Sequence, residues 1–230
     1  MTKTFRSREA AGRLLGERLS ELPLHAPIVV GIPRGGLVTA CEVAKCLDAD
    51  LDVALTERIR SPLYPAVGIG AVGEDDETYL CRPIHEFGDV TEDYIDVESR
   101  LERARLRDLR EIYRPWRHHG SLESRSVIVI DEGVATGSTM QAAVRMLRRR
   151  RPLEILAAAP VASIDVACWL REKCDRFLCL ELTDSNVSIG DCYDAFRAVT
   201  HGEASQILAD YVERRIARRP ASLVKKASLA

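Results

Sequence analysis

One stretch constrains this chain more than any other: VIVIDEGVATGST, at residues 127–139. Four apolar residues precede two acids and a loop of small residues, and a helical pattern follows at 140–147. An apolar run with that continuation indicates a buried strand whose loop opens at the carboxyl edge of a sheet. Because a helix N-terminus exposes amide N–H groups there, the stretch predicts a site for an anion.

Strands and helices alternate along most of the sequence. The expected strands are 27–32, 51–55, 126–131, 153–161 and 176–180, and the expected helices are 7–22, 38–47, 139–150 and 165–173. Apolar strands separated by helices of this length predict an α/β fold, with a parallel sheet covered by helices on both faces. A chain of 230 residues can bury such a core as one domain. We expect that domain over 1–212, followed by a basic, partly disordered tail at 213–230.

The middle of the sequence departs from this alternation. Residues 73–98 carry ten acids against one base, Arg82, and residues 100–117 carry seven arginines against three acids. We interpret them as a polar excursion and a solvated helix with charges of both signs, in preference to a metal or nucleic-acid surface. Just upstream, GIGAVG at 68–73 matches the G-x-G-x-x-G pattern, but no helical period follows, so we interpret it as a strand.

The composition argues against several classes of protein. A formal charge of −2 gives no global reason to expect a membrane or a nucleic acid as partner. The longest apolar run, 155–162, is interrupted by Pro160 and is too short to cross a bilayer. Seven cysteines without a C-x2-C pair predict reduced, buried thiols in a cytoplasmic protein and argue against zinc.

A ligand with a phosphate at one end and vicinal hydroxyls beside it would use both halves of the 127–139 stretch. Its phosphate would contact N–H and hydroxyl groups of Ala135, Thr136, Gly137, Ser138 and Thr139. Asp131 and Glu132 would accept hydrogen bonds from the hydroxyls, directly or through a metal. Such a ligand is a ribose 5-phosphate. The alternative is an ordinary strand–loop–helix junction with both acids as caps.

The same residues resemble a known family. The segment Asp131-Glu132-Gly-Val-Ala-Thr-Gly-Ser-Thr139 resembles the phosphoribosyl-pyrophosphate signature of type I phosphoribosyltransferases, with every position filled. The segment Gly31-Ile-Pro-Arg-Gly-Gly36 resembles the family's pyrophosphate loop, where a peptide N–H and often a cis bond meet the diphosphate. A plain turn is the alternative there. The order of elements is similar to a little-characterised subgroup, which does not supply a substrate.

The resemblance implies a fold and a reaction. The fold is a Rossmann-like parallel sheet with a small hood, which we place at 181–200, with 73–98 as a further contributor. The reaction is Mg²⁺-dependent transfer of the 5-phosphoribosyl group from phosphoribosyl pyrophosphate to a small nitrogenous base, with release of pyrophosphate. Asp131 and Glu132 would hold the Mg²⁺, including indirectly through ribose hydroxyls or water. Such folds commonly pair, so a homodimer is an expectation.

The resemblance also assigns contacts to the diphosphate. Residues of the pyrophosphate loop that would stabilise it are Pro33, Arg34, Gly35 and Gly36. Residues 57–65 occupy the place of a flexible loop that closes over the site, and Arg58 or Arg60 would act there beside Arg34 as catalytic residues. Related sequences have Arg-Lys where this one has Arg58-Ile59, and a surface loop with incidental arginines is the alternative.

Further residues bear on the acceptor and on activity. Ala135 stands where 6-oxopurine transferases have an aspartate acting as acid or base, which weakens a hypoxanthine or guanine acceptor but not an adenine-type one. Tyr193 and Phe196 would stack on the acceptor or, more commonly for aromatics three apart, pack inside the protein. The five histidines look incidental. A non-catalytic sensor of phosphoribosyl pyrophosphate or a nucleotide, on the same fold, is the alternative to an enzyme.

Overall fold

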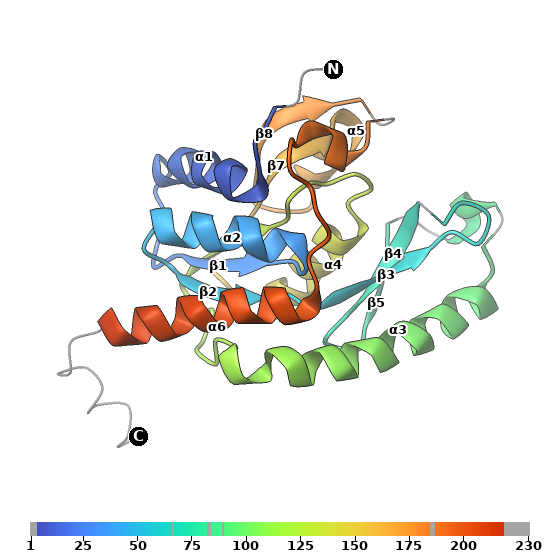
Figure 1. Ribbon diagram of the computed structural model, residues 1–230. Coiled ribbons are helices and arrows are strands. Elements are labelled where there is room, and N and C mark those ends of the chain that lie inside the picture. Colours follow the sequence, from blue (N-terminus) through green and yellow to red (C-terminus); the bar gives the residue numbers. More distant parts are fainter. Residues whose placement is uncertain (1–3, 66, 82–83, 89, 185–186, 219–230) are drawn as a thin grey trace.

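Figure 1 shows the computed structural model, which describes residues 4–65, 67–81, 84–88, 90–184 and 187–218. Five parallel strands form the central sheet, in the order β2 (Asp50–Val53), β1 (Ile28–Gly31), β6 (Ser126–Ile130), β7 (Glu154–Ser163) and β8 (Arg176–Thr183). One face packs against α1 (Arg8–Ser20), α2 (Gly35–Cys46) and α6 (His201–Arg218), and the other against α4 (Ser138–Arg148) and α5 (Ile164–Leu170). The predicted α/β fold with a parallel sheet between helices is confirmed.

The central strands send alternate side chains into two cores, because successive residues of a strand point to opposite faces. Val29 and Ile128 belong to the core beneath α1, α2 and α6, whereas Val30 and Val129 belong to the core beneath α4 and α5. All four side chains are at most 1% exposed. Burial on both faces explains why these strands are continuous apolar runs in the sequence.

A second sheet extends from the first. Its antiparallel strands are β3 (Thr56–Arg60), β4 (Gly68–Gly73) and β5 (Thr78–Leu80), and α3 (Glu92–Tyr113) packs against it. The strand predicted at GIGAVG is confirmed, since it is β4. The loop predicted at 57–65 is wrong for 57–60, which pair with β4 as part of β3 around the fully buried Ile59.

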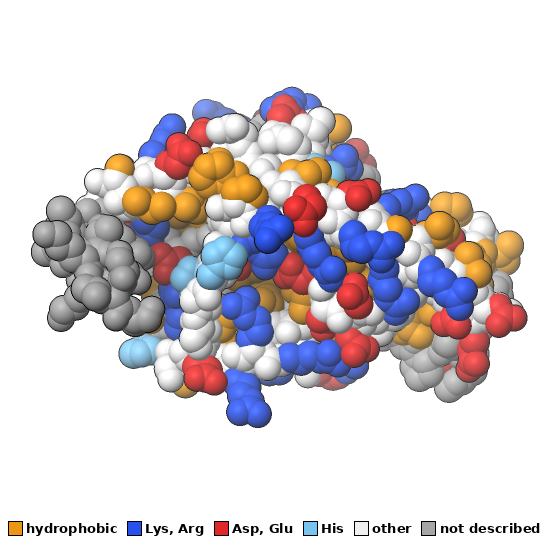
Figure 2. Space-filling view, turned by 90° about the horizontal axis from the view of Figure 1, so that it is seen from below, with side chains coloured by type: hydrophobic (Ala, Val, Ile, Leu, Met, Phe, Trp, Pro, Cys, Tyr) orange, Lys and Arg blue, Asp and Glu red, His pale blue; other side chains and the backbone are white. Residues whose placement is uncertain are grey.

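The long helix α3 contains the end of the acidic excursion and most of the arginine-rich segment. Its buried positions repeat at intervals of three and four residues: Ile95, Ser99, Glu102, Leu106, Leu109 and Tyr113. On this side of the molecule, basic and acidic side chains are intermixed (Figure 2). The solvated helix of mixed charge is therefore confirmed, and it begins earlier than expected, after the capping residue Thr91.

The helix α6 corrects the predicted tail. Residues 213–218 continue this helix instead of being disordered, and Arg215 forms ion pairs with Asp48 at 2.6 Å and Asp50 at 2.9 Å. These pairs fix the end of the helix beside β2. The rest of the predicted tail, 219–230, lies outside the described residues.

All seven cysteines are free thiols. The prediction that they are buried is confirmed for Cys41, Cys174 and Cys192 and is wrong for Cys46 and Cys168, which are exposed where α2 and α5 face solvent. Cys81 and Cys179 are half-buried. Among the described residues, no helix is both long and apolar enough to cross a membrane.

A half-buried arginine links the central sheet to the second one. Arg117, after the short helix η2 (Arg114–Trp116), donates to Asp52 of β2 at 2.7 Å and to both carboxylate oxygens of Glu74 at 2.6 and 2.9 Å. Burial alone would lower the pKa of Arg117, but attraction to Asp52 and Glu74 outweighs it and raises that pKa. Asp52 is only 1% exposed, and Arg117 is the cation that contacts it.

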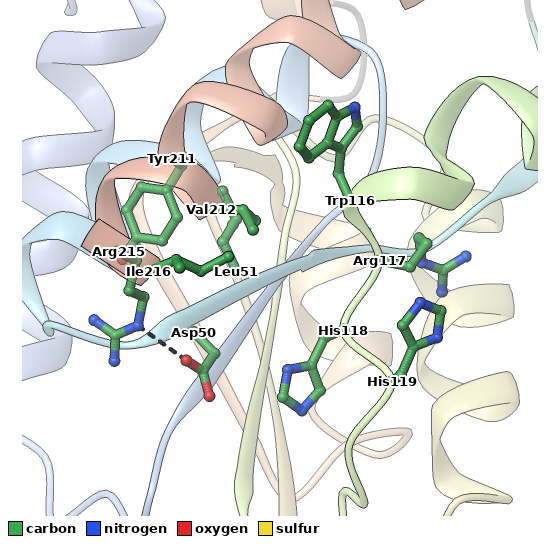
Figure 3. Close-up of a pocket in the computed structure, with 10 residues that line it drawn as sticks. All are labelled: Asp50, Leu51, Trp116, Arg117, His118, His119, Tyr211, Val212, Arg215 and Ile216. Atoms are coloured by element: carbon green, nitrogen blue, oxygen red, sulfur yellow. Dashed lines mark hydrogen bonds and ion pairs between the residues drawn. The ribbon is translucent and has the colours of Figure 1, made fainter. Parts of the chain in front are cut away.

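Figure 3 shows a hollow beside this arginine, between β2, residues 116–119 and α6. Arg215 donates to Asp50 at its edge, and Arg117, which also lines it, is paired with Asp52 and Glu74. Both arginines at this hollow are thus paired with carboxylates of the protein, and they serve the fold.

Replacing Arg117 with Gln is expected to destabilise the protein by about 3–5 kcal/mol, because the buried Asp52 loses its cation. Arg149→Gln is the matched control, since Arg149 contacts Asp75 and Glu77 at the surface, both at 3.3 Å. We expect it to leave the unfolding midpoint unchanged. Equilibrium unfolding in urea measures both variants, and equal midpoints would contradict a structural role for the Arg117 contacts.

Candidate functional site

A cleft opens where β1 and β6 end. The two strands are neighbours, with Gly31 opposite Ile130, so the loops that follow them begin side by side. The cleft has a volume of about 820 Å³. Its walls are the loops after β1 and β6, the strand β3 and the segment 187–201.

Most of the predicted site residues meet at this cleft. Nine line it: Pro33, Arg34, Gly35, Arg58, Arg60, Asp131, Glu132, Ala135 and Thr139. Four are not among its lining residues: Gly36, Thr136, Gly137 and Ser138. The structure therefore gathers three segments that are far apart in the sequence, as the predicted sheet topology requires.

The loop of small residues leads directly into α4. Gly137, at φ +76°, occupies the left-handed region and precedes the helix without any side-chain cap. A helix that begins without a cap leaves the N–H groups of its first turn available to an anion. The hydroxyls of Thr136 and Ser138 lie 3.4 Å apart, and Gly68 of β4 is so near that a Cβ on it would stand 2.6 Å from Ser138 Oγ.

The loop after β1 lies against the two acids. Its Pro33–Arg34 peptide bond is cis, as the resemblance suggested. A Cβ on Gly35 would stand 2.2 Å from Glu132 Oε1. Only a residue without a side chain allows the start of α2 to approach the acids this closely. Arg34 is exposed at the rim of the cleft.

The adjacent acids differ in their surroundings. Asp131 Oδ1 accepts a hydrogen bond from the Glu132 backbone N–H at 2.9 Å. Burial, and after it the charge of Glu132, raises the pKa of Asp131 well above its ordinary value. A cation, or hydroxyl donors, placed against both carboxylates would oppose this effect and favour the ionised pair.

Arg8 is a site residue that the sequence did not reveal. Its guanidinium lies 3.3 Å from Glu132 Oε1, donates to the Arg197 carbonyl at 3.0 Å and lies 3.8 Å from the centre of the Phe196 ring. The side chain is only 8% exposed. No local motif marks Arg8, because its hydrogen-bond partners lie 124 and 189 positions away along the chain. It holds the Glu132 carboxylate, while the Tyr193 hydroxyl donates to the Glu132 carbonyl at 2.5 Å.

The segment 187–201, which forms one wall of the cleft, packs against the N-terminal residue Phe5. Phe5, Tyr193 and Phe196 form a row of ring contacts, with centroids 5.6 and 5.1 Å apart. Tyr193 is 1% exposed, so packing describes it better than stacking on an acceptor, whereas Phe196 also borders the cleft. No described residue of 73–98, the further contributor proposed for the hood, lines the cleft.

The strand β3 forms another wall of the cleft and supplies two of its arginines. Arg58 and Arg60 line the cleft, while Ile59 between them is fully buried. They are therefore held on a strand, although a register shift between Ile59 and Arg60 interrupts the ladder. Glu57 lines the same wall, and burial, followed by repulsion from Glu102, raises its pKa.

A metal would find few protein ligands here. Within the described part of the chain, no group of three or more His, Cys, Asp or Glu side chains is arranged to hold an ion. Asp131 and Glu132 offer two hard carboxylates. This suits a cation such as Mg²⁺, which usually keeps water and takes oxygens from its substrate.

The family model and the curated relative that match this chain name the same family. The family model of the phosphoribosyl transferase domain matches residues 3–197. The Mycobacterium tuberculosis (strain H37Rv) protein named "Putative phosphoribosyl transferase Rv0571c" is 31% identical over 206 residues, which are 90% of this chain and 46% of that protein. This chain thus spans about half the length of that relative. The crystal structure of TT1426 from Thermus thermophilus has 35% identity and a TM-score of 0.76, covering 91% of this chain and 99% of that one.

Replacing Gly35 with Ala is expected to destabilise the fold by about 1–3 kcal/mol, because the added methyl overlaps Glu132 and forces the loop or the acid to move. Gly202→Ala is the matched control, since a Cβ there meets its nearest neighbour at 3.9 Å. That change in α6 is expected to stabilise the protein by about 0.4–1 kcal/mol. Thermal unfolding of both variants measures this, and a neutral Gly35→Ala would contradict the close approach.

Proposed function

The chain belongs to the phosphoribosyl transferase domain family, and on that premise we propose that it transfers a 5-phosphoribosyl group from phosphoribosyl pyrophosphate to a nitrogenous base. One observation carries this proposal. Two adjacent carboxylates, an uncapped helix N-terminus and an arginine-bearing loop meet at a single cleft. A ribose with a phosphate at one end and a diphosphate at the other needs these three kinds of group together.

In the proposed complex each part of the ligand contacts a different set of residues. The 5-phosphate lies against residues 135–139, and the ribose hydroxyls donate to Asp131 and Glu132. The diphosphate lies between the Arg34 loop and the arginines of β3. This arrangement is supported by the presence of all these groups on the walls of one cleft, with the loops after β1 and β6 side by side.

The reaction is a displacement at C1 of the ribose. A bond forms from the nitrogen of the acceptor to C1, the bond from C1 to the diphosphate oxygen breaks, and its electron pair leaves with pyrophosphate. The protein contributes orientation of the ribose and positive charge toward the departing diphosphate, rather than a covalent nucleophile. Bound Mg²⁺, held by Asp131 and Glu132 directly or through the ribose hydroxyls, would add charge neutralisation.

The acceptor end of the cleft is formed by Val187, Ile189 and Phe196, together with Ser188 and Gly190. These mostly apolar groups suit a small, flat base. Ala135, which also lines the cleft, cannot exchange a proton, so the acceptor nitrogen receives no help from that position. A cytosolic location, in keeping with the free thiols, and a homodimer stay predictions.

Replacing Asp131 with Asn and Glu132 with Gln together is expected to weaken binding of phosphoribosyl pyrophosphate at least about 100-fold, since two charge-assisted contacts are lost. Thermal stability is expected to change little, because the shapes are conserved and the loss of repulsion between the two carboxylates offsets the loss of the Arg8 ion pair. Calorimetric titration with and without Mg²⁺ measures the affinity. The double change Asp108→Asn with Glu111→Gln on α3 is the control, and unchanged affinity in the first variant would refute the site.

Replacing Arg34 with Met separates the two halves of the ligand. Loss of one charge-assisted hydrogen bond of about 1.5–3 kcal/mol predicts roughly 10- to 100-fold weaker binding of phosphoribosyl pyrophosphate. Binding of ribose 5-phosphate, which has no diphosphate, is expected to stay as in the unaltered protein. Equal losses for both ligands would show that Arg34 does not face the diphosphate.

A pyrophosphate-release screen against a panel of nitrogenous bases tests the reaction itself. Release with one base, in a Mg²⁺-dependent manner, would identify the acceptor. Metal-dependent binding without release from any base would favour the non-catalytic sensor over the transferase. The absence of any binding would overturn both.

A further inference from the structure

A tyrosine–histidine pair lies where α3 meets α6, and its histidine lines the cleft. Tyr113, the last residue of α3, is fully buried, and His201 is the first residue of α6. The Tyr113 hydroxyl lies 3.1 Å from His201 Nδ1, and the two rings meet edge to face with their centroids 6.0 Å apart. The contact joins residues 88 positions apart, and His201 lines the cleft.

The surroundings of the pair settle where its protons lie. Burial raises the pKa of Tyr113, so the phenol keeps its proton, and among the described residues its hydroxyl has no other hydrogen-bond partner. Burial, and after it the charge of Arg34, lowers the pKa of His201, so the imidazole is neutral at pH 7. The hydroxyl therefore donates to Nδ1, which leaves the imidazole proton on Nε2.

Nε2 is the nitrogen left for a ligand. Among the described residues, Nε2 has no hydrogen-bond partner. It is also not one of the buried side-chain atoms without a partner, so Nε2 is accessible. The charged side chains that act on the pair are Arg34, from the loop after β1, and Glu57, from β3. Both line the same cleft as His201. His201 thus lines the same cleft as Arg34, whose charge acts on it.

We propose that His201, oriented by Tyr113, donates a hydrogen bond from Nε2 to the diphosphate of phosphoribosyl pyrophosphate and to the pyrophosphate that leaves. This role rests on the proposed function. It adds a neutral, directional donor beside the charge of Arg34. Tyr113 is the positioning residue, since it is buried away from the ligand and fixes the tautomer of the imidazole.

The first test is calorimetric titration of the full chain with inorganic pyrophosphate and Mg²⁺. His201→Ala is expected to weaken binding by about 2- to 10-fold, the value of one neutral hydrogen bond, and His201→Gln to restore part of it through its amide N–H. Tyr113→Phe is expected to weaken binding less than His201→Ala. His119→Ala, in the hollow of Figure 3, is the control and is expected to bind as the unaltered protein does. Ribose 5-phosphate is expected to bind all variants equally.

The second test needs no variant and so does not depend on folding of the mutants. In protein labelled with ¹⁵N at histidine, the His201 resonances are expected to show the Nε2–H tautomer, and Nε2 is expected to shift when pyrophosphate is added. Pyrophosphate binding with an unmoved Nε2 and unchanged affinity in His201→Ala would overturn the inference alone. Failure of the unaltered protein to bind either phosphoribosyl pyrophosphate or pyrophosphate would overturn the proposed function, and this inference with it.

Discussion

The site depends on one constraint, the parallel pairing of β1 with β6. Gly31 stands opposite Ile130, and the Ile32 N–H donates to the Ile130 carbonyl at 2.8 Å. The strands β1 and β6 therefore end at the same edge of the sheet. The acids after β6 must then face the loop that opens α2. Sheet topology alone brings the two together, as it does at the carboxyl edge of other open α/β sheets.

That meeting requires space, and the space comes from missing side chains. Because Gly35 has no Cβ, the Glu132 carboxylate can lie against the start of α2, and Arg8 fills the remaining gap. Arg8 in turn contacts Phe196, whose ring contacts Tyr193. The segment 187–201, the N-terminus and Glu132 are therefore packed together through Arg8 and these rings.

The features that the sequence predicted are defined by neighbouring residues. The features that it missed are defined by contacts between residues far apart in the chain. Apolar period and glycine placement located the sheet, GIGAVG and the loop at 135–139, because those signals lie within a few residues. Arg8 and His201 are defined by partners 124 and 88 positions away, which no local pattern encodes. At 57–60 the polar residues that line the cleft hid the strand period, so β3 resembled a loop.

The charges around the cleft give a reason for a metal in the proposed reaction. Its lining holds four arginines, Arg8, Arg34, Arg58 and Arg60, against three acids, Glu57, Asp131 and Glu132. Arg8 is already paired with Glu132, and burial, followed by the adjacent charge of Glu132, raises the pKa of Asp131. Three arginines remain for a ligand that carries a phosphate and a diphosphate. A cation placed between the acids and the diphosphate would relieve the repulsion of both, which arginines on the opposite wall cannot do.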